Sequence, residues 1–152
     1  WTGRHDDLEV LELLNGYTKN RKRKPKENTV VTIVRRYMAP LSTVEDGTAE
    51  ERKELWDEWF ENITMENDKL LSQMILRHYW SGTYNPRKET PIIFIREFAS
   101  MADADDGGWD EPMEEFWPNE EQRKERLAQG NKYWLSRHED IGIYRNLVNL
   151  QK

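Results

Sequence analysis

A histidine and a carboxylate on neighbouring expected strands are the first candidates for chemistry in this sequence. His78 lies within a strand-like segment, residues 73–80, and Glu97 lies late in the next one, residues 91–99. A carboxylate that accepts a hydrogen bond from an imidazole orients the ring and strengthens it as a base, so the two groups together can transfer protons. They could also bind a metal ion, although two ligands fall short of the three or four that a site needs. The structural alternative is a polar contact across the strands, or a histidine packed beside Trp80.

Basic and phenolic side chains on the same expected strands are candidates for binding an anionic ligand. Arg35 and Tyr37 share one face of the segment 29–38, and Arg96 directly precedes Glu97. Guanidinium and phenol groups that line one cavity can bind a carboxylate or a phosphate. Salt bridges with Glu97 or with the helices are the alternative role for these side chains. The sequence therefore predicts a ligand-binding set made of Arg35, Tyr37, Trp80 and Arg96.

A second histidine–carboxylate pair lies in the motif Trp134-Leu-Ser-Arg-His138-Glu-Asp140. The surrounding pattern predicts a helix that reaches about residue 137, which would place Trp134 and His138 one turn apart on the same face. Asp140 would follow the helix end and could accept a hydrogen bond from the imidazole, and the helix dipole would favour a charged histidine there. The pair could act in proton transfer, or the motif could serve only to anchor and end the helix.

The same motif opens the sequence, which indicates an internal repeat. Residues 1–16 align without gaps with residues 134–149, where unrelated segments would share about one residue. Identical residues stand at five pairs of positions: Trp1/Trp134, Arg4/Arg137, His5/His138, Asp7/Asp140 and Leu14/Leu147. We therefore expect a piece of a tandem-repeat protein. Residues 1–18 would be the tail of a preceding repeat or an N-terminal arm, residues 19–28 a basic linker, and residues 29–152 one domain.

The hydrophobic content and the net charge of the sequence limit the kinds of protein it can be. Hydrophobic residues make up 36% of the 152 residues, so seven Trp, six Tyr and four Phe must supply much of the core. The net charge of −6 argues against a general nucleic-acid binder, although residues 19–26 are strongly basic. This basic run could bind phosphate groups or act as a nuclear signal, and the repeat favours a solvated linker instead.

The residue types that are missing exclude several kinds of site. The sequence contains no Cys, which excludes disulfides, cysteine-ligated zinc and cysteine nucleophiles. We expect no metal and no cofactor, and no apolar run is long enough to span a membrane. A chain that begins at Trp1 within a repeat fits a processed protein, and we expect one that is secreted or exported to the periplasm; it also fits a proteolysed or engineered fragment.

Hydrophobic periodicity predicts both strands and helices. Alternation and β-branched residues predict three strands, at residues 29–38, 73–80 and 91–99. Thr48 and Glu51 form a capping box for a helix over 48–63, and Asn119 is a suitable N-cap for a helix over 119–137. The acidic, glycine-bearing segment 103–109 is expected to be a loop, and residues 141–150 a last strand or a helical turn.

This order of elements is that of the ferredoxin-like βαββα(β) fold, in the α+β class. An antiparallel sheet with two helices on one face leaves its other face uncovered, and exposed apolar sheet is costly. A second copy of the same sheet is the simplest cover. A homodimer or a second repeat of the same protein would supply it, giving a dimeric or tandem pseudo-dimeric α/β barrel.

Three segments resemble the NIPSNAP-like branch of the dimeric α/β-barrel superfamily. They are the strand ending Arg35-Arg-Tyr37, the strand Leu76-Arg-His-Tyr-Trp-Ser-Gly82, and the segment from Ile92 to Ala104 with its Ser-Met-Ala-Asp sequence. The resemblance covers roughly residues 29–137 and implies this fold and its pairing. The superfamily includes antibiotic-biosynthesis-type monooxygenases, haem-degrading enzymes and members without known activity, so membership implies no particular reaction.

Two functions from different classes fit these observations. The first is a non-catalytic interaction or assembly module whose partner is another copy of itself, with the aromatic and acidic segment 103–118 supplying contacts. The second is a monooxygenase-like or isomerase-like enzyme that binds a small molecule in a cavity lined by His78, Glu97, Arg35 or Tyr37. A cavity filled with side chains would favour the first function, and an open cavity the second. Neither function involves nucleic acid or a membrane.

Overall fold

One antiparallel sheet organises the protein. The computed structural model describes residues 9–25, 27–81 and 90–147, and within them five strands lie in the order β1-β3-β4-β2-β5. Their bounds are Glu9–Leu13 (β1), Thr29–Met38 (β2), Leu70–Ser81 (β3), Thr90–Phe98 (β4) and Trp134–Asn146 (β5).

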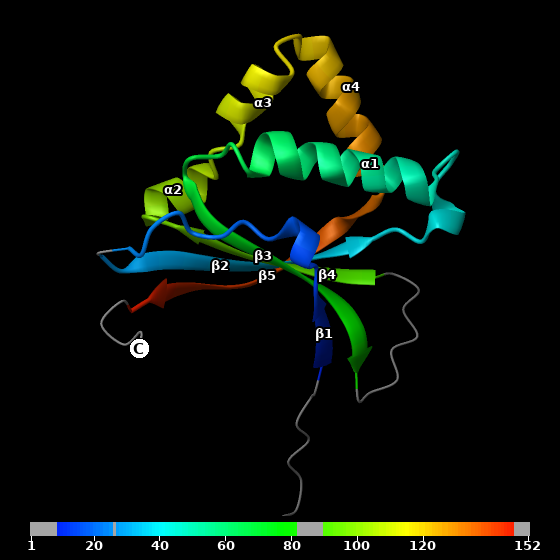
Figure 1. Ribbon diagram of the computed structural model, residues 1–152. Coiled ribbons are helices and arrows are strands. Elements are labelled where there is room, and N and C mark those ends of the chain that lie inside the picture. Colours follow the sequence, from blue (N-terminus) through cyan, green and yellow to red (C-terminus); the bar gives the residue numbers. More distant parts are fainter. Residues whose placement is uncertain (1–8, 26, 82–89, 148–152) are drawn as a thin grey trace, which may run out of the picture.

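The four α-helices of the described residues lie on the same side of the sheet (Figure 1). Their bounds are Ala49–Trp59 (α1), Met101–Asp106 (α2), Asp110–Phe116 (α3) and Glu120–Asn131 (α4). Helix α1 continues into a π-helical turn, η3, at Phe60–Thr64, and 3₁₀ turns lie at Asn15–Tyr17 (η1) and Leu41–Thr43 (η2). No described helix is both long and apolar enough to cross a membrane.

The α+β class and the one-sided placement of the helices are confirmed. Strands β5, β2, β4 and β3 have the order of a ferredoxin-like sheet, and α1 and α4 are its two crossover helices. Strand β1 extends this sheet at the edge of β3, where Leu13 is paired with Leu76. Helices α2 and α3, which lie between β4 and α4, were not predicted from the sequence.

Both predicted helix caps are confirmed. Thr48 Oγ1 accepts a hydrogen bond from the Glu51 amide at 3.0 Å, and Asn119 Oδ1 accepts one from the Gln122 amide at 3.0 Å. Each bond satisfies an amide that has no partner inside its helix, so these two residues determine where α1 and α4 begin.

The predicted end of the second helix is wrong, because residues 134–137 belong to a strand. Helix α4 ends at Asn131, directly after Gly130, and β5 begins at Trp134. The free edge of β2 offers Trp134 a backbone partner in Met38, and this long-range pairing overrides local helical spacing.

The expected loop at 103–109 is partly helical. Ser100 caps α2 by accepting a hydrogen bond from the Asp103 amide at 3.1 Å, and Gly107 ends the helix with a φ of 73°. A left-handed residue at this position is a common helix terminator that glycine adopts without strain.

The start of the basic segment that follows β1 is bound to the domain, whereas Lys22, Arg23 and Lys24 are exposed as expected of a solvated linker. Lys19 is 4% exposed, and its ammonium group donates hydrogen bonds to the carbonyl oxygens of Thr64 at 3.0 Å and Asn67 at 2.6 Å. Arg21 binds the carboxylate of Glu97, with its Nη2 2.7 Å from Oε1. Residues 9–21 are therefore an integral part of the sheet layer.

The first copy of the Trp-x-x-Arg-His motif lies outside the described residues, whereas the second copy lies in β5. Positions 1–8, with Trp1, Arg4, His5 and Asp7, and positions 148–152 are not among the residues that the structure describes. Residues 9–13 and their aligned counterparts 142–146 are both strands, but the first pairs with β3 and the second with β2.

The core lies between the sheet and the helices and is rich in aromatic rings. Ile75, Ile92 and Phe94 are its buried centre. The rings of Trp56 and Trp134 stack on each other above them with centroids 5.5 Å apart. Aromatic area thus compensates for the low hydrophobic content of the chain.

Candidate functional site

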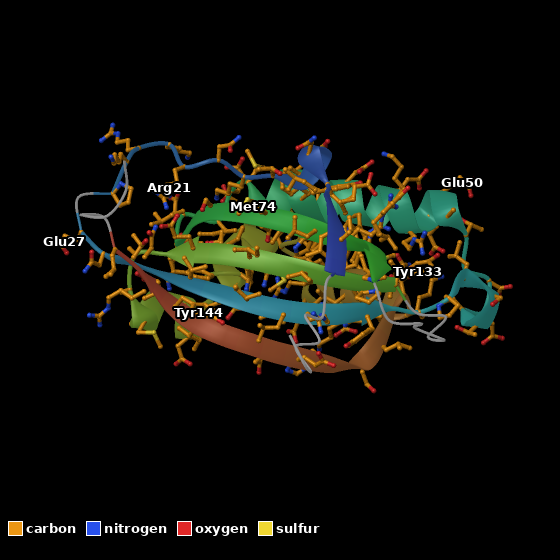
Figure 2. The ribbon with its side chains drawn as sticks, turned by 90° about the horizontal axis from the view of Figure 1, so that it is seen from below. Arg21, Glu27, Glu50, Met74, Tyr133 and Tyr144 are labelled. Carbon is orange, nitrogen blue, oxygen red and sulfur yellow. The ribbon has the colours of Figure 1, made fainter. Side chains whose placement is uncertain are left out.

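The sheet face opposite the helices, called here the open face, is mostly apolar. None of the described helices covers it, and Figure 2 views the molecule from this side, with Met74 and Tyr144 labelled. Met74 is 43% exposed and Tyr144 is 51% exposed. Strand register and alternation assign the remaining apolar side chains of this face: Leu11, Leu13, Val31, Ile33, Leu76, Ile93 and Ile95.

Two predicted ligand-binding residues on the open face already bind a carboxylate of the protein itself. Arg35 Nη1 lies 3.1 Å from Glu139 Oε2, and the buried Tyr37 hydroxyl donates a hydrogen bond to Glu139 Oε1 at 2.5 Å. Glu139 comes from β5 beside them, so Arg35 and Tyr37 connect β2 to β5. This is the salt-bridge alternative for these residues, although the partner is neither Glu97 nor a helix.

Glu97 is buried and fully engaged in hydrogen bonds. Its carboxylate accepts bonds from Thr29, from Ser72 at 2.9 Å, from Asn146 at 3.0 Å and from two nitrogens of Arg21. Burial alone would raise the pKa of Glu97, but the bonds from Thr29, Asn146, Arg21 and Ser72 outweigh it and hold the pKa below its ordinary value. A carboxylate of this kind stays ionised at neutral pH and is poorly suited to donate or accept a proton.

The structure does not bring His78 and Glu97 together. Both side chains belong to the open face, but Ser72 is the β3 residue paired with Glu97, and His78 lies six residues further along β3. Six strand residues span about 20 Å, which is far beyond hydrogen-bond reach. The predicted proton-transfer pair is therefore not formed, and the side chain of Trp80 lies outside the described part of the chain.

The second pair, His138 and Asp140, lies at the surface of β5. The His138 Nε2 and Asp140 Oδ2 atoms are 3.8 Å apart, and the two side chains are 58% and 76% exposed. The segment is a strand and not a helix, so His138 and Trp134 are not one helical turn apart as predicted. Trp134 points into the core and stacks on Trp56, so the motif anchors β5.

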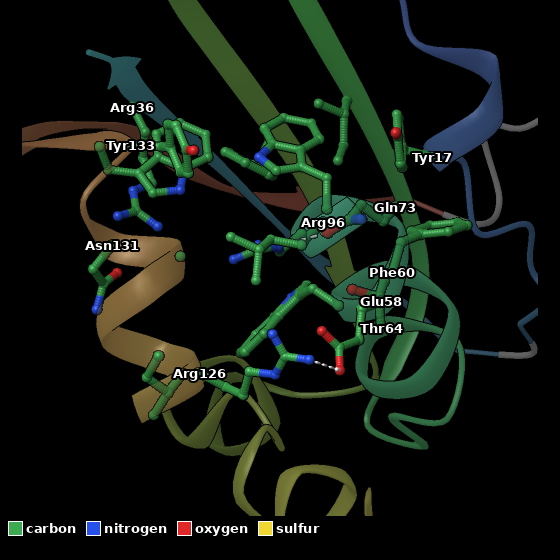
Figure 3. Close-up of a pocket in the computed structure, with 18 of the residues that line it drawn as sticks. Tyr17, Arg36, Glu58, Phe60, Thr64, Gln73, Arg96, Arg126, Asn131 and Tyr133 are labelled. Carbon is green, nitrogen blue, oxygen red and sulfur yellow. Dashed lines mark hydrogen bonds and ion pairs between the residues drawn. The ribbon is translucent and has the colours of Figure 1, made fainter. Parts of the chain in front are cut away.

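Arg96 lies on the helix side of the sheet, away from Arg35 and Tyr37, and lines a pocket that we call the helix-side pocket. This pocket has a volume of about 170 Å³ and lies between the sheet, α1, η3 and α4 (Figure 3). Eight aromatic side chains contribute to its wall: Tyr17, Trp56, Trp59, Phe60, Phe94, Trp117, Tyr133 and Trp134.

Two guanidinium groups line the helix-side pocket without a carboxylate partner among the described residues. Arg36 lies over the ring of Trp134, 4.5 Å from its centroid. Arg96 lies 4.8 Å from the centroid of Phe94 and 4.7 Å from that of Trp109, and its Nε donates a hydrogen bond to Gln73 Oε1 at 2.9 Å. Both arginines are partly buried, and aromatic faces take the place of the anion that such a cation ordinarily has.

The pKa values of both arginines are lowered, as expected for cations that have no carboxylate partner among the described residues. Burial, together with the nearby charge of Arg36, lowers the pKa of Arg96 to about 10. Burial also lowers the pKa of Arg36. Both groups are still charged at neutral pH, so the pocket holds two cations that burial and mutual repulsion destabilise.

The carboxylate in the pocket wall is already bound. Glu58 Oε1 lies 3.6 Å from Arg126 Nη2, and Figure 3 shows this contact at the side of the pocket away from Arg36. The π-helical turn η3 places Phe60 and Thr64 in the wall as well. Such turns are frequent at functional sites because they redirect side chains within a helix.

Arg36, which lines the helix-side pocket, was not among the predicted site residues although its signal was present. Arg36 alternates with Val34 on the face of β2 that the helices must cover, and a charge on such a face needs a partner. That partner is the ring of Trp134, which is distant in the sequence, and local sequence does not show the proximity. The described residues hold no cluster of three or more side chains suited to a metal ion.

Comparison with protein-family models, with curated proteins and with solved structures finds no match for this chain, so its function has to be inferred from the geometry of the open face and the helix-side pocket.

Proposed function

We propose that this protein is an assembly module whose open face binds the open face of a second copy of the chain. The observation that carries the proposal is an apolar sheet face that none of the described helices covers, with Met74 and Tyr144 about half exposed on it. Apolar patches of this kind on a folded protein mark interaction sites because their exposure to water is costly.

The size of the open face suits a stable dimer. Strands about 4.8 Å apart and about nine residues long, at ~3.3 Å per residue, give a five-stranded face of roughly 700 Å². Stable complexes typically bury about 800 Å² on each partner. Part of this area is already buried within the chain, since Tyr37 is 1% and Ile93 4% exposed, so the open face needs its rim to provide the area that a specific interface requires.

Charge pairing on the open face favours an identical partner. The chain carries a net charge of −6, yet the charged groups of the face neutralise one another as Arg35 with Glu139 and Arg21 with Glu97. A neutral apolar face does not repel its own copy, and it has no excess charge to select an oppositely charged partner. A two-fold axis through the face would bring these same residues together from both chains.

The pairing also agrees with the sequence resemblance. Two ferredoxin-like sheets that meet through their helix-free faces form the dimeric α/β barrel that the NIPSNAP-like segments imply. The ferredoxin-like strand order and the one-sided helices support this assignment.

Replacement of Met74 by Glu tests the proposal. We expect wild type to have twice the mass of one chain by light scattering and Met74→Glu to have the mass of one. Two unpaired carboxylates would be buried at the interface, which weakens association by roughly 100-fold or more. Sedimentation equilibrium would measure the dissociation constants of both proteins.

Matched controls separate the open face from other surfaces. Met101 on α2 is also exposed, so Met101→Glu introduces the same charge on the helix side and should leave the dimer intact. Ile143 on the edge strand β5 is 60% exposed, so Ile143→Glu tests association through the sheet edge. If Ile143→Glu were monomeric while Met74→Glu stayed dimeric, the chains would pair through their edges and not through their open faces. A wild-type chain that stays monomeric at high concentration would overturn the proposal outright.

A further inference from the structure

The helix-side pocket combines positive charge with an aromatic wall in a protein that is acidic as a whole. Its wall contains Arg36, Arg96 and Arg126 but only Glu58 as an acid, in a chain whose net charge is −6. Arg126 binds Glu58, whereas the other two guanidinium groups find no carboxylate among the described residues. Arg36 and Arg96 are both partly buried, and cations withdrawn from water are ordinarily paired, so these two are suited to receive an anion from outside the chain.

The helices around the pocket favour a carboxylate over a phosphate. Both helices line the pocket with the C-terminal halves of their sequences. Helix α1 contributes Leu55, Trp56, Glu58 and Trp59, and α4 contributes Arg126, Leu127, Gly130 and Asn131. Phosphate sites typically use the free N–H groups and positive dipole of a helix N-terminus, which are missing at this end. A planar monoanion fits guanidinium groups without that contribution.

Pocket size and wall chemistry define the rest of the ligand. Cavities of about 150 Å³ hold one six-membered ring, and this pocket measures about 170 Å³. The ring centroids of Trp56, Trp134 and Phe94 are 5.5 to 6.5 Å apart. A flat ring placed beside these three rings would make aromatic contacts with them.

We propose that the helix-side pocket binds a single-ring aromatic carboxylate. Its carboxylate is held by Arg36 and Arg96, and its ring packs against Trp56, Trp134 and Phe94. This site lies on the opposite side of the sheet from the open face, so the inference goes beyond the assembly function and does not depend on it.

Titration of the full chain with benzoate tests the proposal, with tryptophan fluorescence and calorimetry as readouts. Benzamide has nearly the same shape without the charge, and inorganic phosphate has charge without the ring. We expect benzoate to bind at least about tenfold more tightly than benzamide, because hydrogen bonds to a charged group carry the difference. Phosphate should neither bind measurably nor compete.

Arginine variants locate the bound anion. Arg96→Gln should weaken benzoate binding by about 10- to 100-fold. The matched control is Arg77→Gln, which removes an arginine whose Nη2 binds Glu12 at the exposed edge of the sheet and should leave binding unchanged. If Arg96→Gln does not fold, nitrogen-15 NMR of wild type gives the same answer, because benzoate should shift the Nε–H signals of Arg36 and Arg96 and leave that of Arg77 in place.

Three outcomes would overturn the inference. Equal affinities for benzoate and benzamide would show an apolar cavity without anion recognition. Displacement of benzoate by phosphate would show a general anion site, and the absence of binding throughout the millimolar range would show no site. A monomeric protein that binds benzoate through Arg96 would disprove the assembly function and leave this inference standing.

Discussion

Glu97 connects four strands and the N-terminal segment through one carboxylate. Its hydrogen-bond donors are Thr29 of β2, Ser72 of β3, Asn146 of β5 and Arg21 of the segment before β2, while Glu97 itself belongs to β4. A buried carboxylate with this many donors stays charged, and removal of its charge leaves Arg21 without its partner.

We therefore expect Glu97→Gln to lower the free energy of unfolding by about 3 kcal/mol at pH 7. The pKa of Glu97 is lowered in the folded protein from its ordinary value of 4.5, so its contribution is complete above that pH and is lost as pH falls through the lowered pKa. Urea denaturation across the acid range should show wild-type stability falling toward that of the variant.

Glu12 provides the control for this prediction. It binds Arg77 at the edge of the sheet, with both side chains about half exposed, so Glu12→Gln should change stability little at any pH. A loss for Glu12→Gln as large as that for Glu97→Gln would show that burial is not the cause. A Glu97→Gln variant that is as stable as wild type at pH 7 would contradict the structural role itself.

Two glycines at helix ends differ in whether the structure tolerates a side chain at their position. Gly107 ends α2 with a φ of 73°, and a Cβ added there would lie 2.6 Å from Trp109 Nε1. Gly130 lies in the last turn of α4, and a Cβ added there would meet no atom within 4 Å. The first glycine is needed for the turn that leads to α3, and the second is a weak point in a helix.

Alanine substitution should therefore change stability in opposite directions. Gly107→Ala is expected to destabilise by about 1–2 kcal/mol because a left-handed backbone is strained in alanine. Gly130→Ala is expected to stabilise by about 0.5–1 kcal/mol, since alanine has the higher helix propensity. Thermal unfolding of both variants beside wild type measures the difference, and the same sign for both would refute the argument.

Elements with strong local signals were predicted well from the sequence. The strand at residues 29–38 has the bounds of β2, and the caps at Thr48 and Asn119 begin α1 and α4. Alternation, β-branched residues and capping side chains act within a few residues, so one segment suffices to show them.

The remaining features depend on partners that are distant in the chain. Strand β5 begins at Trp134 because β2 is available to it, and Lys19 is buried because the carbonyl groups of Thr64 and Asn67 receive it. Dependence on distant partners also explains why the predicted His78–Glu97 site is not formed. His78 and Glu97 stand on adjacent strands as expected, but strand register, which the sequence does not reveal, separates them.

At the scale of the whole molecule, the sheet separates two surfaces with different chemistry. The open face is apolar and neutral, whereas the helix-side pocket is aromatic and cationic. We expect the two to act independently, because no described residue of the open face named above lines the pocket.

Measurement of both dimer mass and benzoate affinity in each of the two single variants tests this independence. Met74→Glu should be a monomer that binds benzoate with wild-type affinity, and Arg96→Gln should remain a dimer that binds it weakly. Light scattering and calorimetry on the same samples measure both properties. A change of benzoate affinity by more than about tenfold in Met74→Glu would instead reveal coupling between the two sides of the sheet.

The binding of Lys19 and Arg21 has a consequence for how this protein could be divided. Residues 9–21 are held by strand pairing and by side chains inserted into the domain, while Lys22, Arg23 and Lys24 are exposed. A break in the backbone at those exposed lysines would cut none of these contacts. The two pieces would behave as complementary fragments that reassemble without a covalent link, so the domain is naturally suited to being split there into a peptide and its receptor.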